Sequence, residues 1–272
     1  MLALILAELA WRLGRNRGYD GRAALTTLGL VAGGLPFAAL NAFVLGTMFE
    51  AASRLALWQL PLADWRTWGL GFLAVEFAYY WFHRASHRIR WMWASHAVHH
   101  SAEQLTLLSS FRLGWTNLLS AGWIFYVPLV LLGLPPAGVF VLLAANLRYQ
   151  FFLHTEAVGR LGPIEWVFNT PAHHRLHHAS NDCYIDRNYG GVLILFDRLF
   201  GTLAREVEGE AIRYGLAHRA PSYNVPGIAL SEWWGMARDA VRMRGLDQVV
   251  RALFGPPGAV ADTGHSFTQP KS

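Results

Sequence analysis

The sequence of 272 residues has little charge and almost no cysteine. Charged residues make up 15% of the chain, whereas hydrophobic residues make up 53%, and the mean hydropathy is +0.24. The single cysteine, Cys183, excludes a disulfide scaffold. The aromatic content of 14% excludes an intrinsically disordered chain. This composition is typical of a protein embedded in a membrane.

Several cofactor and enzyme motifs are also missing. The sequence has no GxGxxG turn and no cysteine spacing for haem or an iron–sulfur cluster, so any electrons must come from an external donor. It has no HExxH and no Glu-x-x-His pair, which disfavours a zincin protease and a carboxylate di-iron bundle. The net charge of +5 is spread along the chain rather than gathered in one tract. We therefore expect no nucleic-acid partner, and a membrane surface accounts for the charge better.

Three windows with little or no charge are long enough to cross a bilayer, which takes about 20 apolar residues. Residues 23–49 carry no charge, residues 67–83 carry only Glu76, and residues 113–147 carry none. The third window is too long for one crossing, and Pro135 and Pro136 predict a turn within it. We expect an all-α integral membrane protein with four transmembrane helices, at about residues 24–49, 67–83, 113–134 and 137–153.

The remaining segments are expected at the membrane surface within a single domain, residues 1–272. Residues 2–11 are apolar but short, which favours an interfacial helix. Residues 156–254 have mixed composition and predict a helical cap, and residues 255–272 predict a frayed tail.

Arginines indicate the orientation of the chain. Arg12, Arg15, Arg17 and Arg22 precede the first span, which predicts a cytoplasmic N-terminus. With four crossings, the histidine-rich segments, the cap and the C-terminus lie on the same side. Arginine outnumbers lysine 22 to 1, which suggests a GC-rich bacterial genome and hence an inner membrane.

The histidines are the most informative feature of the sequence. Ten of the twelve lie between residues 83 and 178, and eight of these form one HxxxH box and two HxxHH boxes. On a helix, residues at i, i+3 and i+4 lie on one side, so each box is expected to face one way. The box residues are His83, His87, His96, His99, His100, His174, His177 and His178. We assign no role to His218 or His265.

Eight imidazoles exceed what one tetrahedral zinc can use, so the boxes predict two metal ions. Imidazole suits zinc, copper, iron and nickel, and the ligand type leaves the metal open. His154, after the fourth span, is a candidate ninth ligand, or else a histidine at the membrane rim. His173 is a candidate either for a contact that orients a ligand or for a weaker ligand itself. Glu76 is a candidate for a contact that orients a ligand, and a purely structural hydrogen bond is an equal alternative for it.

The order of the boxes, together with Asn169-Thr-Pro-Ala-His-His-Arg-Leu-His-His178, resembles the fatty acid hydroxylase and sterol desaturase superfamily of membrane di-iron enzymes. The likeness runs from about residue 77 to residue 203. Within the superfamily, Phe152-Leu-His154-Thr-Glu156 and Asp186-Arg-Asn-Tyr189 look most like the alkylglycerol monooxygenase branch. That branch carries an acidic residue directly after the first box, where this sequence has Arg88.

The resemblance implies two Fe ions held by the box histidines and His154, and no catalytic residue separate from these ligands. It implies O2-dependent hydroxylation or desaturation of a fatty acyl, sterol or ether lipid. The reductant would be a redox partner protein or a small molecule. Arg175, Arg187 and Arg198 are candidates for docking such a partner, and binding of anionic headgroups is an equal alternative for them. A zinc-dependent lipid hydrolase and a non-catalytic metal-binding protein are the alternatives; the oligomeric state is not predicted.

Overall fold

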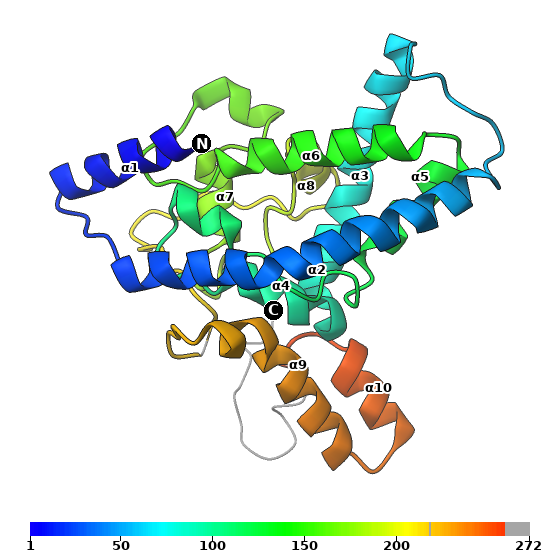
Figure 1. Ribbon diagram of the computed structural model, residues 1–272. Helices are drawn as coiled ribbons and strands as arrows, with labels where there is room; N and C mark the ends of the chain where they lie inside the picture. The colour runs from blue at the N-terminus through cyan, green and yellow to red at the C-terminus, as the bar shows by residue number, and fades with distance from the viewer. Residues whose placement is uncertain (218, 259–272) are drawn as a thin grey trace.

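The computed structural model describes residues 1–217 and 219–258, so His218, His265 and most of the expected tail lie outside the described residues. Over those ranges the chain forms helices, and other backbone pairing is limited to two isolated antiparallel bridges, Phe168 with Leu193 and Ala179 with Tyr214. The all-helical expectation is confirmed. The α-helices, labelled as in Figure 1, are α1 (Leu2–Gly14), α2 (Gly21–Ser53), α3 (Trp65–Arg88), α4 (Arg90–His100), α5 (Val127–Leu131), α6 (Pro136–Phe151), α7 (Pro171–His177), α8 (Leu195–Leu199), α9 (Val225–Arg242) and α10 (Leu246–Phe254), and the 3-10 helices are η1 (Leu107–Phe111), η2 (Gly122–Phe125) and η3 (Gly162–Trp166).

Helix α2 is the one helix in the described part of the chain that is long and apolar enough to cross a membrane. The carboxylate of Asp20 caps its first turn by accepting from the backbone N–H groups of Arg22 and Ala23. Its most apolar window has a mean hydropathy of 1.9, and only 6% of that window is buried inside the protein. An exposed apolar helix of this length fits a lipid environment.

The expected helices at residues 67–83 and 137–153 correspond to α3 and α6, whose ends differ from the predicted bounds by one to five residues. They pack together with α5 and the end of α2 around a core that includes Phe49, Val75, Val130 and Leu142. The predicted turn is also present, because α5 ends at Leu131 and α6 begins at Pro136. Helix α6, with 16 residues, is shorter than the roughly 20 residues that a helix needs to cross a bilayer.

The expected continuous helix at residues 113–134 is wrong. Its first half forms turns and the short helix η2, and only Val127–Leu131 is α-helical. Gly114 lies against the backbone of Ser95, and Gly122 lies against the ring of Phe82, so close that a Cβ at either position would collide. Contacts with α3 and α4 therefore override the apolar composition, which carries no information about such close approaches.

Helices α4 and α7, short loops and the end of α6 form the centre of the molecule, and the α9–α10 pair packs on one side of it, with α9 against α4 (Figure 1). The C-terminal part of α3 continues into this centre and turns at Ile89 directly into α4. The fold thus brings the histidine-rich ends of α3, α4, α6 and α7 together.

Candidate metal centre

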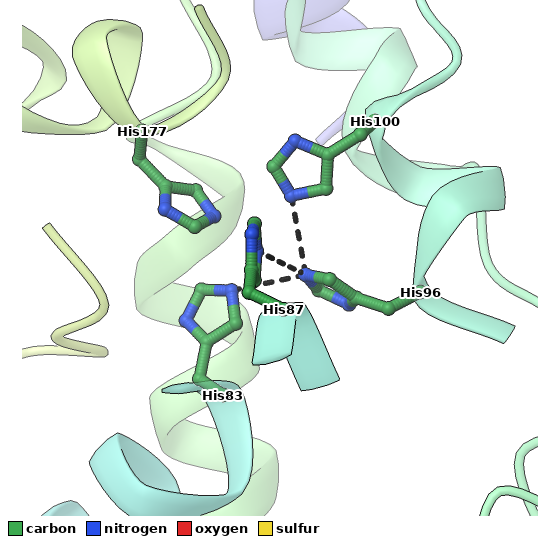
Figure 2. Close-up of side chains that lie close together, drawn as sticks. All are labelled: His83, His87, His96, His100 and His177. Carbon is green, nitrogen blue, oxygen red and sulfur yellow. Dashed lines mark hydrogen bonds between the residues drawn. The ribbon is translucent and has the colours of Figure 1, made fainter. Parts of the chain in front are cut away.

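Nine histidines converge in two adjacent groups at the centre of the molecule. In each group one ring nitrogen per histidine lies within 4.8 Å of the same atoms of the others. The first group contains five histidines, which Figure 2 shows pointing toward one another from α3, α4 and α7, and the second contains four. The five are His83, His87, His96, His100 and His177, and the four are His99, His154, His174 and His178. The structure therefore brings together every residue that the sequence analysis named as a metal ligand, while metal binding itself stays a prediction.

The expectation that each HxxHH box faces one way is wrong. In both boxes the histidines at positions i and i+4 belong to one group and the histidine at i+3 belongs to the other. His96 and His100 lie in the five-histidine group, whereas His99 lies in the four-histidine group. The third box is divided in the opposite sense, with His177 in the five-histidine group. Each HxxHH box therefore contributes to both groups, whereas His83 and His87 of the HxxxH box both lie in the five-histidine group.

The ring nitrogens of the four-histidine group fit a bound cation. The Nδ1 atoms of His99 and His154 lie 3.2 and 2.7 Å from the backbone carbonyl oxygens of Arg112 and Gln150. A carbonyl only accepts, so each Nδ1 carries the hydrogen, and each neutral ring has a lone pair on Nε2. These two Nε2 atoms are 3.1 Å apart, and two lone pairs cannot form a hydrogen bond with each other. A metal ion between them resolves the conflict.

The five-histidine group leads to the same result. Nε2 of His96 lies 3.1 Å from Nε2 of each of His83, His87 and His100, as the dashed lines in Figure 2 show. One ring nitrogen has a single in-plane hydrogen or lone pair, so it cannot satisfy three partners. Nε2 of His177 is buried and has no hydrogen-bond partner. The chemistry of this donor set therefore fits a metal ion.

Burial keeps these imidazoles neutral. It lowers the pKa of His99 to about 4 and the pKa of His177 to about 3. A metal ligand must be deprotonated, and at neutral pH protons do not compete for these nitrogens.

A single loop supports three members of the five-histidine group. Nδ1 of His177 donates to the carbonyl oxygen of Arg187 at 2.9 Å, and Nδ1 of His83 donates to the carbonyl oxygen of Tyr189 at 2.8 Å. The carboxylate of Asp186 lies 3.7 Å from Nδ1 of His87 and also accepts from Arg88 at 2.9 Å. We call residues 186–189 the carbonyl strap. Such contacts orient metal-binding histidines and fix their tautomers.

Two buried side chains hold the strap in place. Asn188 has a left-handed φ of 56° and is completely buried; its amide donates to the carbonyl oxygens of His173 and Ala204 and accepts from the N–H of Ala204. Asp197 accepts from the N–H groups of Tyr189 and Gly190 at 2.8 and 2.7 Å. Sequence reasoning missed both residues and all four carbonyl acceptors, because every residue type has a carbonyl. The Asn-Tyr-Gly-Gly run, which predicts a constrained loop, was the available signal.

Glu76 and His173 belong to neither group. The Glu76 carboxylate accepts from the N–H groups of Val192 and Leu193 and from Asn146, so it fixes the loop that follows the strap rather than contacting a histidine. His173 has a buried Nδ1 without a hydrogen-bond partner, and its carbonyl oxygen accepts from Asn188.

The three arginines expected at a docking surface all donate to backbone carbonyls. Arg175 donates to Thr155 and Val158, Arg187 donates to Gly201, and Arg198 donates to Glu165 and Trp166. Charge reversal at these positions would disturb local structure as well as any docking.

The fold and the two groups define a class: an all-helical protein with a candidate dinuclear histidine site. Residues 68–202, which contain all nine histidines, match the fatty acid hydroxylase family, and this part of the chain belongs to it.

The relatives of the chain include alkylglycerol monooxygenases and a bacterial lipid hydroxylase. The chain is 40% identical to the alkylglycerol monooxygenase of Danio rerio over 200 residues, which cover 74% of this chain and 44% of that protein. It is 48% identical to that of Homo sapiens over 162 residues, 60% of this chain and 36% of that protein. It is 34% identical to an ornithine lipid hydroxylase of Rhizobium tropici over 134 residues, 49% of this chain and 40% of that protein.

The matched region is thus less than half the length of each of these relatives. Their names support an oxidoreductase and confirm the resemblance found in the sequence. No solved structure matches the chain at a significant level.

Proposed function

We propose that this chain is a membrane-bound, O2-dependent oxidoreductase that hydroxylates a C–H bond of a lipid, with one Fe ion in each histidine group. The observation that carries the proposal is the pair of facing, unprotonated Nε2 atoms of His99 and His154, because only a bound cation makes this contact favourable. Family membership supports iron, and relatives named monooxygenase and hydroxylase support hydroxylation over desaturation.

Iron bound at the two groups would supply the oxidising chemistry that an unactivated C–H bond requires. The chain contributes the remaining parts. Its nine imidazoles would hold the metals, and the carbonyl oxygens of Arg112, Gln150, Arg187 and Tyr189 orient four of these rings. Burial of the groups excludes water, which protects a reactive site from side reactions.

An alkyl ether lipid is the substrate class that we propose to test first, because the relatives with 40% and 48% identity are alkylglycerol monooxygenases. The electrons would come from an external reductant, either a protein or a small molecule.

The chain would form one membrane domain, with α2, α3, α6 and the region around α5 in the bilayer. The N-terminus and histidines would face the cytoplasmic side of a bacterial inner membrane, a topology that accessibility of introduced cysteines would test.

The first experiment is to purify the protein in mild detergent, measure iron and zinc per chain, and incubate it with an alkylglycerol, a reductant and ¹⁸O2. We expect two irons per chain and one labelled oxygen atom in the product. The variants His177→Ala and His99→Ala should each lose one iron and the product, because each removes a ligand from a different group. His265→Ala is the matched histidine-to-alanine control.

Three outcomes would contradict the proposal. Full activity in either ligand variant would refute the ligand assignment. Turnover of lipid without O2, with zinc bound, would favour a hydrolase. Tight metal binding without any change in lipid, across an ether-lipid, acyl-lipid and sterol series, would favour a non-catalytic metal-binding protein.

A further inference from the structure

Helix α1 has its polar side buried and its apolar side exposed. Glu8 and Arg12, one helical turn apart, are 5% and 3% exposed. Leu2, Leu6 and Leu13 are 70%, 54% and 58% exposed. A surface helix of a water-soluble protein has the reverse arrangement, with charges outward and leucines inward. The exposed leucines of α1 therefore require an apolar neighbour.

The buried charges join α1 to the segment that follows α6. The Glu8 carboxylate accepts from the hydroxyl of Thr155 and, at 2.7 Å, from the N–H of Leu107. The Arg12 guanidinium forms an ion pair with Glu156 at 2.7 Å and donates to the carbonyl oxygen of Gly18 at 3.0 Å. Figure 1 shows α1 at one edge of the molecule, beside the end of α6. These contacts fix the direction in which the leucines point.

Charge and continuity identify the neighbour as a lipid bilayer with anionic headgroups. The exposed Arg15, Arg17 and Arg22 follow the apolar face, whereas the acids nearest to them, Glu8 and Asp20, are both hydrogen-bonded within the chain. Cations beside an apolar helical face match the boundary between anionic headgroups and acyl chains.

Helix α2, which begins seven residues after α1 ends, continues the same kind of surface. Leu25 and Leu28 in its first turns are exposed as well. Exposed leucines on α1 and on the first turns of the candidate membrane helix, with exposed arginines between them, are expected to meet the same bilayer.

We propose that α1 lies in the headgroup region of an anionic membrane, with its leucine face among the acyl chains and Glu8 and Arg12 turned toward the protein. The membrane then holds α1 against Thr155 and Glu156, the two residues that follow His154. This placement is independent of the reaction that the histidine groups carry out.

The test measures the depth of α1 in lipid for the full-length chain. In a Cys183→Ser background, Leu6→Cys is labelled with an environment-sensitive fluorophore and placed, one chain per disc, in nanodiscs of phosphatidylglycerol and phosphatidylcholine. Glu208→Cys, an exposed position in the cap, is the matched control. Leu13→Cys repeats the measurement at the other end of the same face, in case the first label disturbs folding.

We expect blue-shifted emission at positions 6 and 13 that lipids brominated on the acyl chain quench, and no quenching at position 208. Replacing Arg15 and Arg17 by Gln should weaken docking by roughly fivefold per arginine in anionic discs and have little effect in neutral discs. A water-exposed label at both leucine positions would overturn the proposal. Shielding without quenching by bromine would also overturn it, since a protein surface would then cover α1.

Discussion

Replacing Asn188 by alanine is expected to release one metal ion and retain the other. The Asn188 amide holds the carbonyl strap, whose carbonyls orient His177 and His83 in the five-histidine group. The carbonyl contacts of the four-histidine group run instead to Arg112 and Gln150. Asn188 also contacts α7 through the carbonyl oxygen of His173, but the strap carbonyls themselves reach only the five-histidine group. A loosened strap should therefore weaken the five-histidine group more than the four-histidine group.

The magnitude follows from the lost contacts. Asn188→Ala leaves the buried carbonyls of His173 and Ala204 and the N–H of Ala204 without their side-chain partner, and each unsatisfied group costs about 1–3 kcal/mol. At the left-handed φ of 56°, the conformational free energy of alanine is about 1 kcal/mol less favourable than that of asparagine. We expect the free energy of unfolding to fall by at least about 3 kcal/mol. Loss of outer contacts to ligating histidines typically reduces metal affinity about 10- to 100-fold.

The assay is metal content per chain after dialysis against a graded chelator series, together with Co²⁺ titration followed by its visible absorption. Asn181→Ala is the matched control, because Asn181 is equally buried and also forms three side-chain hydrogen bonds, to Glu210, Ala211 and Arg213, away from the strap. Asn188→Ala should approach one metal per chain, and Asn181→Ala should keep two. Equal loss in both variants, or two tightly bound metals in Asn188→Ala, would refute the argument.

Three further predictions concern protonation and buried hydrogen bonds. Burial lowers the pKa of His99 to about 4 and that of His177 to about 3, so between these values and about pH 6.5 the unfolded chain binds more protons than the folded chain. The metal-free protein should therefore lose stability as the pH falls below about 6.5. A Tm that stays constant from pH 7 to pH 5 would contradict this prediction. Burial raises the pKa of Asp197 to about 6, so between about pH 4 and pH 6 the folded state binds more protons than the unfolded state. The Tm of the wild type relative to that of Asp197→Asn should therefore rise as the pH falls from about 6 to about 4. Glu76→Gln must set its NH2 donor either against the N–H groups of Val192 and Leu193 or against the NH2 group of Asn146. It should reduce the free energy of unfolding by about 2 kcal/mol or more, as a denaturation curve in detergent would measure.

Local sequence signals predicted a large part of this fold. The charge-free windows and the proline pair predicted α2, α3, α6 and the turn before α6 to within a few residues. The prediction of a helix from residue 113 to residue 126 was wrong, because the conformation of this segment depends on contacts with side chains that are distant in the sequence. The approach of Gly122 to Phe82 is one such contact, and composition does not encode it. The convergence of the eight box histidines could be predicted because their type and spacing are specific. His154 lies outside the boxes, and the sequence left it as one of two alternatives. The backbone carbonyls that orient these histidines could not be predicted, because every residue has a carbonyl and the residue type therefore does not mark an acceptor.

The division of the HxxHH boxes has a geometric reason. Each residue of an α-helix advances about 100° around the axis, so i and i+4 lie about 40° apart, whereas i+3 lies about 60° to the other side of i. One such box can offer a pair of ligands to one metal and a single ligand to a second metal beside it. Two boxes divided in opposite senses, as at His99 and His177, would supply two metals from two short helices. The HxxxH box then adds a pair of histidines to the five-histidine group, and His154 adds a single histidine to the four-histidine group. The spacing of the boxes is therefore the one that two adjacent sites require, and a single site would not need the histidine at i+3.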